Sequence, residues 1–296
     1  MRESRRQQFA ESPDVLLGAF DQRTRVPVRD FFLGGDEFIT IAGPCSVETE
    51  GQIMATAHHV RRGGARMLRG GAFKPRSSPY AFQGLGLAGL KLLAHAREAT
   101  GLAVVTEVMS ETDVALVAEY SDVLQIGSRN MENYALLEAA ARSGRPILLK
   151  RGMVATLADF LHSAQVVLDY GNPWVILCER GIRTFETAMR NTFDAAGIAL
   201  LKQVTHLPVI AYPSHAAGHR ELVPALARIG VAAGADGLIV EVHPDPDTAW
   251  SDGEQSLDFA EFDAMMADLE PWIAARAREP RSLRTTDKQV LEAVTG

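Results

Sequence analysis

Four residues that commonly bind transition metals stand at or beyond the ends of short apolar runs in this chain. They are Cys45, His215, Glu241 and Asp252. Thiolate, imidazole and carboxylate ligands together suit a borderline divalent transition metal rather than magnesium or calcium. Spacing alone leaves an alternative open, because a lone cysteine after a strand is more often part of a core.

Basic residues also gather directly after the apolar runs, although the chain as a whole is acidic, with a net charge of −7 at pH 7. They are Arg69, Lys74, Arg76, Arg129, Lys150, Arg151, Arg180 and Arg183. One such residue is ordinarily a solvated loop charge, but clustered cations repel one another unless an anion is bound. Because the arginine fork matches phosphate and carboxylate geometry, the pattern predicts a ligand with more than one such group.

The elements that position these residues are eight short apolar runs separated by amphipathic segments. We expect strands at 38–42, 66–69, 102–106, 122–126, 146–150, 174–178, 207–211 and 237–241. Helical patterns fill most of the gaps, at 52–62, 86–99, 111–119, 132–143, 155–168, 221–233 and 258–276. Such alternation is typical of βαβ units and a parallel sheet. Eight units predict the α/β class and a closed (β/α)8 TIM barrel, in which chemistry lies at the carboxyl ends of the strands.

An open doubly wound sheet is the alternative architecture. It would need fewer strands, and no Gly-x-Gly-x-x-Gly motif follows the first one. We therefore expect a short N-terminal arm or hairpin at 1–36, one catalytic barrel at 37–278 and a C-terminal tail at 279–296. A chain of 296 residues is compatible with this, since α/β barrels commonly take roughly 250 residues as one domain.

Composition narrows the partners and the compartment. The acidic balance argues against nucleic acid as a partner, and no uninterrupted apolar stretch of about 18 residues is present to span a membrane. We see no signal peptide at the N-terminus. Two cysteines, Cys45 and Cys178, imply no disulfide framework and favour a reducing cytoplasm. Cys178 lies inside an apolar run, so we expect it in the core.

Several motifs, in order along the chain, resemble the 3-deoxy-7-phosphoheptulonate (DAHP) synthases of the short bacterial type, type Iβ. They are Ile41-Ala42-Gly43-Pro44-Cys45-Ser46, Leu68-Arg69-Gly70-Gly71-Ala72-Phe73-Lys74-Pro75-Arg76, Gln125-Ile126-Gly127-Ser128-Arg129-Asn130, Leu148-Leu149-Lys150-Arg151-Gly152, Cys178-Glu179-Arg180-Gly181, Pro213-Ser214-His215 and Val240-Glu241-Val242-His243-Pro244. The resemblance extends from about residue 36 to about residue 275.

The resemblance implies roles for individual residues. It implies that a divalent transition metal of the Mn, Fe, Co or Zn class is bound by Cys45, His215, Glu241 and Asp252. It implies a phosphoenolpyruvate pocket formed by Arg69, Lys74, Arg129, Lys150 and Arg180. The aldose phosphate is expected to contact Arg76 and Ser77. The residues expected to take part in catalysis are Lys74, Cys45 and His215.

The activity that the resemblance implies is a metal-dependent condensation of phosphoenolpyruvate with erythrose 4-phosphate, which yields DAHP and phosphate in the first step of the shikimate pathway. It also implies a cytoplasmic homo-oligomer, a dimer or a tetramer, with small-molecule substrates. The 3-deoxy-octulosonate 8-phosphate synthases are a sister family. They usually carry Lys-Ala-Asn-Arg where this chain has Lys74-Pro75-Arg76, so the heptulosonate product is preferred.

Three departures from the family pattern leave alternatives open. Tyr212 stands where the family usually has Asp, His219 where it has Arg or Lys, and Ser77 where it has Thr. They raise the alternatives of a divergent paralogue that uses another aldose phosphate in a specialised pathway, and of a weakly active binding subunit. A class I aldolase, with Lys150 as the Schiff-base lysine, is a further alternative.

Overall fold

The computed structural model describes residues 15–16, 23–74, 82–276 and 293. Most of the tail expected at 279–296, and residues 1–14 and 17–22 of the expected arm, therefore lie outside the described residues. Among the helices of the described segments, none is both long and apolar enough to cross a membrane.

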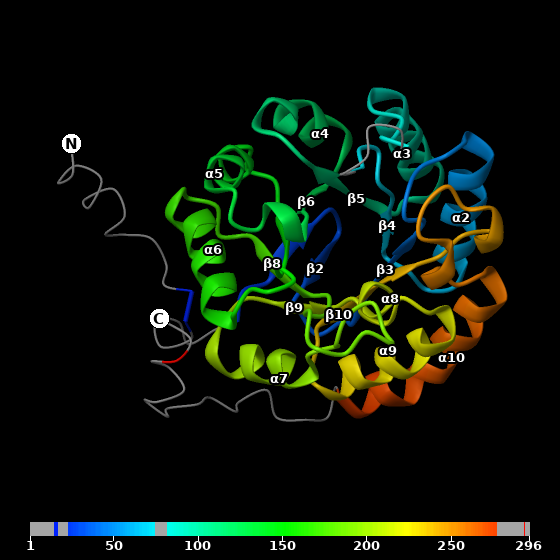
Figure 1. The fold of residues 1–296 in the computed structure, drawn as a ribbon. Helices are drawn as coiled ribbons and strands as arrows, with labels where there is room; N and C mark the ends of the chain where they lie inside the picture. The colour runs from blue at the N-terminus through cyan, green and yellow to red at the C-terminus, as the bar shows by residue number, and fades with distance from the viewer. Residues whose placement is uncertain (1–14, 17–22, 75–81, 277–292, 294–296) are drawn as a thin grey trace.

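Eight parallel strands close into a barrel in which each strand pairs with the next along the chain and the last pairs with the first (Figure 1). They are β3 (Ile39–Gly43), β4 (Met67–Arg69), β5 (Ala103–Val108), β6 (Val123–Ile126), β7 (Ile147–Lys150), β8 (Val175–Glu179), β9 (Val209–Ala211) and β10 (Gly237–Glu241). Each overlaps one of the eight predicted strands. The predicted (β/α)8 TIM barrel is thus confirmed.

Helices form a ring around the strands in Figure 1. They are α2 (Glu50–Arg62), α3 (Leu87–Thr100), α4 (Val114–Tyr120), α5 (Tyr134–Arg142), α6 (Leu157–Asp169), α7 (Ala195–Val204), α8 (Pro213–Ala217), α9 (Val223–Ala232) and α10 (Phe259–Arg276). Short 3-10 turns lie at Glu111–Asp113, Ser128–Asn130, Arg220–Leu222, Pro246–Thr248 and Gly253–Gln255, the last of which is η6. Helices α7 and α8 were not among the helical segments predicted. The first is nevertheless signalled by Asp194, whose carboxylate caps it by accepting from the Gly197 amide at 2.7 Å.

Two apolar layers hold the barrel together. Side chains alternate along each strand, so Ala42 of β3 packs outward against the helices whereas Ile39 and Ile41 point into the barrel. The same alternation places Met67 and Ile239 in the interior layer. The barrel is therefore a packed core at mid-height rather than a pore.

A hairpin precedes the barrel and covers its N-terminal end. Strands β1 (Val26–Val28) and β2 (Phe31–Leu33) pair antiparallel. Their buried side chains belong to the same apolar cluster as the barrel interior, and the dark-blue hairpin is seen through the barrel in Figure 1. Burial of this end leaves the carboxyl ends of the strands as the face on which the site lies.

Candidate active site

Strand alternation explains why charged side chains point into the upper end of the barrel. Arg69, Lys150 and Glu241 each stand two residues beyond an interior apolar residue of the same strand. Because side chains repeat every second residue along a strand, these three must face the interior as well. All three are buried. The sequence pattern thus forces ionisable groups into the barrel one layer above its apolar filling.

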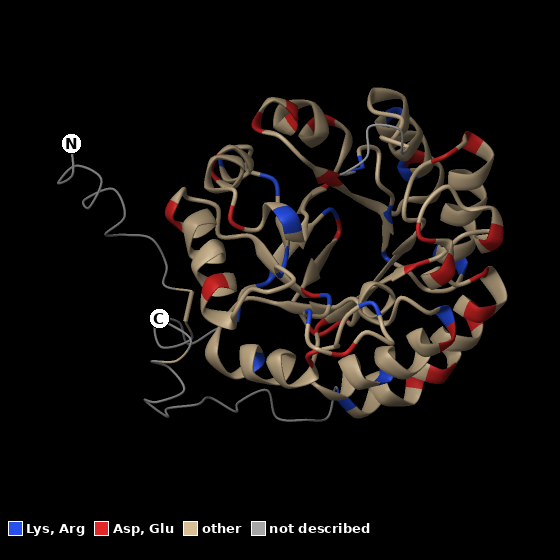
Figure 2. Ribbon diagram, in the orientation of Figure 1, with Lys and Arg blue, Asp and Glu red and all other residues tan. Residues whose placement is uncertain are grey.

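Arg69 and Lys150 line a cavity of about 230 Å³ at the carboxyl ends of the strands. Its basic lining residues are Arg69, Lys74, Arg129, Lys150, Arg180, Arg183 and Arg190. Figure 2 shows basic segments gathered around the barrel centre, while much of the acidic sequence lies on the outer helices. Among the described residues, no carboxylate forms an ion pair with Lys150, Arg180 or Arg183. A cavity with this lining is suited to a small ligand that carries several negative charges.

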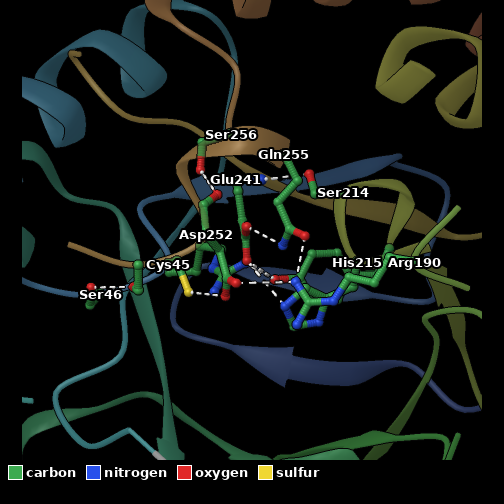
Figure 3. Close-up of polar contacts among 12 residues, drawn as sticks. Cys45, Ser46, Arg190, Ser214, His215, Glu241, Asp252, Gln255 and Ser256 are labelled. Atoms are coloured by element: carbon green, nitrogen blue, oxygen red, sulfur yellow. Dashed lines mark hydrogen bonds and ion pairs between the residues drawn. The ribbon is translucent and has the colours of Figure 1, made fainter. Parts of the chain in front are cut away.

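Three of the four residues proposed as metal ligands converge at one edge of this cavity. Ligand atoms of Cys45, Glu241 and Asp252 all lie within 4.8 Å of one another. His215 adjoins them, with its Nε2 atom 3.3 Å from Oε1 of Glu241 (Figure 3). The four residues come from loops and strand ends far apart in the sequence, and the barrel brings them together.

The turn after β3 delivers Cys45 to this edge. Gly43 has a φ of +149°, and a Cβ atom there would lie 2.2 Å from the carbonyl oxygen of Arg69. Only glycine fits such a close approach. The Cys45 thiol donates to Oδ2 of Asp252 at 2.9 Å and accepts from the Lys74 ammonium at 2.8 Å.

Glu241 is held by hydrogen bonds to both of its oxygens. Oε1 accepts from the Tyr212 hydroxyl at 2.5 Å and from Arg69 at 2.8 Å, and Oε2 accepts from the Gln255 amide at 2.5 Å. Its backbone amide donates to Ser214 at 3.0 Å. A fully buried carboxylate with these partners is compensated for its loss of water.

The donor set fits a divalent transition metal. Burial raises the pKa of the Cys45 thiol to about 11, so a cation must displace its proton. Burial, assisted by Lys150 and Arg180, holds the pKa of His215 well below its usual range, so the imidazole is neutral. Nδ1 of His215 is buried with no hydrogen-bond partner among the described residues. Thiol, neutral imidazole and two carboxylates form a ligand set typical of such metals.

The cationic half of the cavity has lowered pKa values. Burial, with the charge of Arg69, lowers the pKa of Lys150 to about 8. Burial also lowers the pKa of Arg180 to about 10, with Arg190 as the second cause. Crowded cations of this kind are stabilised by an anion, because its charge offsets both their repulsion and their lost hydration.

One predicted rim residue, Arg151, does not line the described cavity. Arg151 turns away and pairs with Glu179 at 2.9 Å and with Asp194 at 2.7 Å, which makes it a structural residue. Arg76 and Ser77 lie outside the described residues.

Position 219 lies apart from the cavity. His219 is exposed and is not among the residues that line it. The side chain at this position therefore does not face the described part of the cavity.

Residues that the sequence analysis missed complete the site. Arg190 and Asn191 line the cavity, and Gln255 bonds to Glu241 beneath it. The two cavity residues lie in the long loop after β8, and Gln255 lies in η6. No periodic pattern marks such loop residues. A signal was available only in the local run Arg190-Asn191, where a cation precedes an amide next to the cap of α7.

Comparison with known proteins decides the family. The family model described as DAHP synthetase I matches residues 19–274. This chain belongs to that family. The predicted resemblance to DAHP synthases is thereby confirmed, and the enzymes of this family form carbon–carbon bonds.

Named members of the family include close relatives of this chain. The phospho-2-dehydro-3-deoxyheptonate aldolase of Thermotoga maritima is 49% identical over 246 residues, which cover 83% of this chain and 73% of the relative. The crystal structure of the same organism's DAHP synthase matches with a TM-score of 0.87 and 45% identity, over 90% of this chain and 78% of that chain. A truncated form from Thermotoga maritima gives a TM-score of 0.84 and 42% identity, over 91% and 98%.

The sister family is more distant. The 2-dehydro-3-deoxyphosphooctonate aldolase of Caulobacter vibrioides is 34% identical over 264 residues, which cover 83% of this chain and 90% of the relative. The heptulosonate enzymes among these relatives are thus more similar to this chain than this octulosonate enzyme.

Proposed function

We propose that this DAHP synthase family member condenses phosphoenolpyruvate with erythrose 4-phosphate and releases phosphate. The product is 3-deoxy-D-arabino-heptulosonate 7-phosphate, the first intermediate of aromatic biosynthesis. One observation supports this above all others: a cationic cavity and a transition-metal ligand set share one site in a chain that is 49% identical to a heptulosonate enzyme. The reaction needs both, since one substrate is a trianion and the other an aldehyde to be activated.

The cations hold phosphoenolpyruvate. Arg129, Lys150 and Arg180 contribute the charges that bind its phosphate and carboxylate groups, and Arg69 lies at the boundary with the metal half. These groups are fixed before substrate arrives, so they stabilise developing charge with little reorganisation. They also fix the orientation of the enol carbon relative to the aldehyde.

The bond changes balance without an external oxidant or reductant. The C3 carbon of phosphoenolpyruvate forms a bond to the aldehyde carbon of the sugar. Water adds at C2, and the C2–O bond to phosphate breaks. The Lys74 ammonium, 2.8 Å from the sulfur of Cys45, is positioned to give a proton to the oxygen of the former aldehyde.

The metal would be bound by Cys45, His215, Glu241 and Asp252. When bound, such an ion supplies Lewis acidity to the aldehyde carbonyl. Glu241 and Asp252 are held by hydrogen bonds in the described structure, so the protein presents two of the ligands already oriented.

A phosphate-release assay tests the function. The purified chain, loaded with Mn²⁺, is mixed with phosphoenolpyruvate and with erythrose 4-phosphate, ribose 5-phosphate or arabinose 5-phosphate in turn. Released phosphate is measured, and the mass of each sugar product is determined by mass spectrometry. We expect efficient release with erythrose 4-phosphate and a seven-carbon product. If arabinose 5-phosphate were instead the efficient substrate and gave an eight-carbon product, the chain would be an octulosonate 8-phosphate synthase. No turnover with any aldose phosphate would favour a binding subunit.

We also propose that the chain acts in the cytoplasm as a homo-oligomer, a dimer or a tetramer. Two unpaired cysteines are compatible with a reducing compartment. Exposed apolar residues on the rim loops, such as Val154 and Phe185, offer surface for self-association. Light scattering coupled to size-exclusion chromatography measures the assembly.

A further inference from the structure

Arg190 lies near the end of the loop between β8 and α7. Ile182 and Thr192 pair as an antiparallel bridge that closes the base of this loop, and most residues between them are exposed. The backbone amide of Arg190 donates to the carbonyl oxygen of Ala217 in α8 at 3.2 Å. The loop is therefore fixed against the helix that carries His215.

The Arg190 side chain reaches two residues of the loop after β10. Its NH1 atom donates to Oδ1 of Asp252 at 3.1 Å and to Oε1 of Gln255 at 2.5 Å. Nε2 of Gln255 in turn donates to Oε2 of Glu241 at 2.5 Å, as Figure 3 shows. One arginine and one glutamine thus engage both carboxylates of the proposed metal set.

The pair binds one oxygen of each carboxylate and leaves the other facing the remaining ligands. Oδ1 of Asp252 accepts from Arg190, while Oδ2 lies 2.9 Å from the sulfur of Cys45. Oε2 of Glu241 accepts from Gln255, while Oε1 lies 3.3 Å from Nε2 of His215. The other oxygen of each carboxylate thus lies beside another residue of the proposed metal set, and ligand atoms of Cys45, Glu241 and Asp252 all lie within 4.8 Å of one another.

Arg190 also fixes the orientation of the Gln255 amide. A guanidinium can only donate hydrogen bonds, so Gln255 must turn its carbonyl oxygen toward Arg190. Its NH₂ group then faces Glu241, which can only accept when ionised. Without the arginine, a rotated amide would present an oxygen to the carboxylate, and the two acceptors would repel each other.

We propose that Arg190 and Gln255 are positioning residues that orient Asp252 and Glu241 for the divalent metal, an inference that rests on the proposed function. Hydrogen bonds to ligand side chains typically change metal affinity by about 10- to 100-fold. Gln255 is buried and does not line the cavity, so its contribution cannot come from contact with substrate. Arg190 does line the cavity and needs a test without substrate.

The test is a titration of metal-free protein with Co²⁺ alone, followed by the thiolate-to-cobalt absorption of Cys45 and by competition with a chelator. The variants are Gln255→Met, which keeps the side-chain volume without the amide, and Arg190→Lys, which keeps the charge without the fork. Arg183→Lys is the matched control, because Arg183 lines the same cavity and forms no ion pair with a described carboxylate. Thermal unfolding of the metal-free proteins establishes that each variant is folded, and Gln255→Asn replaces Gln255→Met if the latter is not.

We expect Gln255→Met and Arg190→Lys to bind Co²⁺ at least about 10-fold more weakly than the wild type, with an altered absorption band, and Arg183→Lys to bind as the wild type does. Wild-type affinity in both variants would overturn the positioning role while leaving the proposed function intact. A wild-type protein that binds no Co²⁺ would overturn the metal site itself and the inference with it. An effect of Arg190→Lys confined to the Michaelis constant for the aldose phosphate would make Arg190 a substrate contact instead.

Discussion

The ammonium nitrogen of Lys150 lies 4.6 Å from the centre of the Tyr212 ring. The same ring stacks on His215, one of the proposed metal ligands, with 4.2 Å between the ring centroids. A desolvated cation over an aromatic face gains about 2 kcal/mol or more. Tyr212 therefore contacts both a residue of the proposed phosphoenolpyruvate pocket and a residue of the proposed metal set.

Two substitutions separate the ring of Tyr212 from its hydroxyl. Tyr212→Phe keeps the ring under Lys150 and removes the hydrogen bond to Glu241, so we expect kcat/KM for phosphoenolpyruvate to fall about fivefold, the equivalent of about 1 kcal/mol. Tyr212→Leu removes both the aromatic ring and the hydrogen bond, so it should lower kcat/KM for phosphoenolpyruvate further. Steady-state kinetics with each substrate varied in turn measures this. A change in the Michaelis constant for the aldose phosphate alone would contradict a role of Tyr212 in phosphoenolpyruvate binding.

Tyr212 and His219, the two departures from the family pattern after β9, bear on which aldose phosphate the enzyme accepts. His219 is exposed, so His219→Arg by itself should leave the ratio of specificity constants across aldose phosphates unchanged. The double variant Tyr212→Asp with His219→Arg tests the specialised-acceptor alternative. Efficient wild-type turnover of erythrose 4-phosphate that the double variant does not improve would remove support for that alternative.

Metal removal should abolish activity. We expect turnover to be lost on dialysis against chelator and restored by Mn²⁺ or Co²⁺, because the thiol, imidazole and carboxylate set suits such ions. Cys45→Ser and His215→Ala should each prevent restoration without lowering the unfolding temperature of the metal-free protein. Cys178→Ser is the matched control, since Cys178 belongs to the apolar interior cluster. Full activity in excess chelator would contradict the metal site.

The cationic half should act mainly on phosphoenolpyruvate. Arg129→Ala or Arg180→Ala removes a charged hydrogen-bond donor worth about 1.5–3 kcal/mol, so kcat/KM for this substrate should fall about 10- to 150-fold. The Michaelis constant for the aldose phosphate should change less. Arg142→Ala, on the exposed surface of α5, is the control. Equal losses of kcat/KM for both substrates would contradict the assignment of these arginines to phosphoenolpyruvate binding.

Lys150 should make phosphoenolpyruvate binding pH-dependent. Its pKa is lowered to about 8, so the ammonium form is present below that pH and is lost as the pH rises through it. We therefore expect kcat/KM for phosphoenolpyruvate to decline above about pH 8, since this ratio reports the free enzyme. Lys150→Arg, charged throughout, should remove that decline. A wild-type profile that stays level to pH 10 would mean that the charge of Lys150 is not used.

Arg151 should matter for stability rather than for substrate. It forms a buried ion pair with Glu179, and removing one partner of such a pair typically costs about 3–5 kcal/mol. Arg151→Met should therefore lower the free energy of unfolding in urea by about that amount, with a smaller effect on the Michaelis constant for phosphoenolpyruvate than Arg180→Ala. An unchanged unfolding curve would contradict this assignment.

Much of the fold and part of the site could be predicted from sequence, for local reasons. Apolar runs between amphipathic segments predicted eight strands, and the alternation of side chains along β4, β7 and β10 turned Arg69, Lys150 and Glu241 inward. Motifs at the strand ends pointed to Cys45 and His215. These features depend on residues within a few positions of one another, so they are visible in a linear chain.

Tertiary structure alone decided how side chains from different loops pair. Arg151 and Arg180 both follow strand ends, yet only Arg180 lines the cavity, because Glu179 and Asp194 bind Arg151. Arg190 and Gln255 lie in separate loops and meet only because the closed barrel brings the ends of β8 and β10 to one rim. Such pairings depend on distances between segments that are remote in sequence, and the closing of the barrel sets those distances.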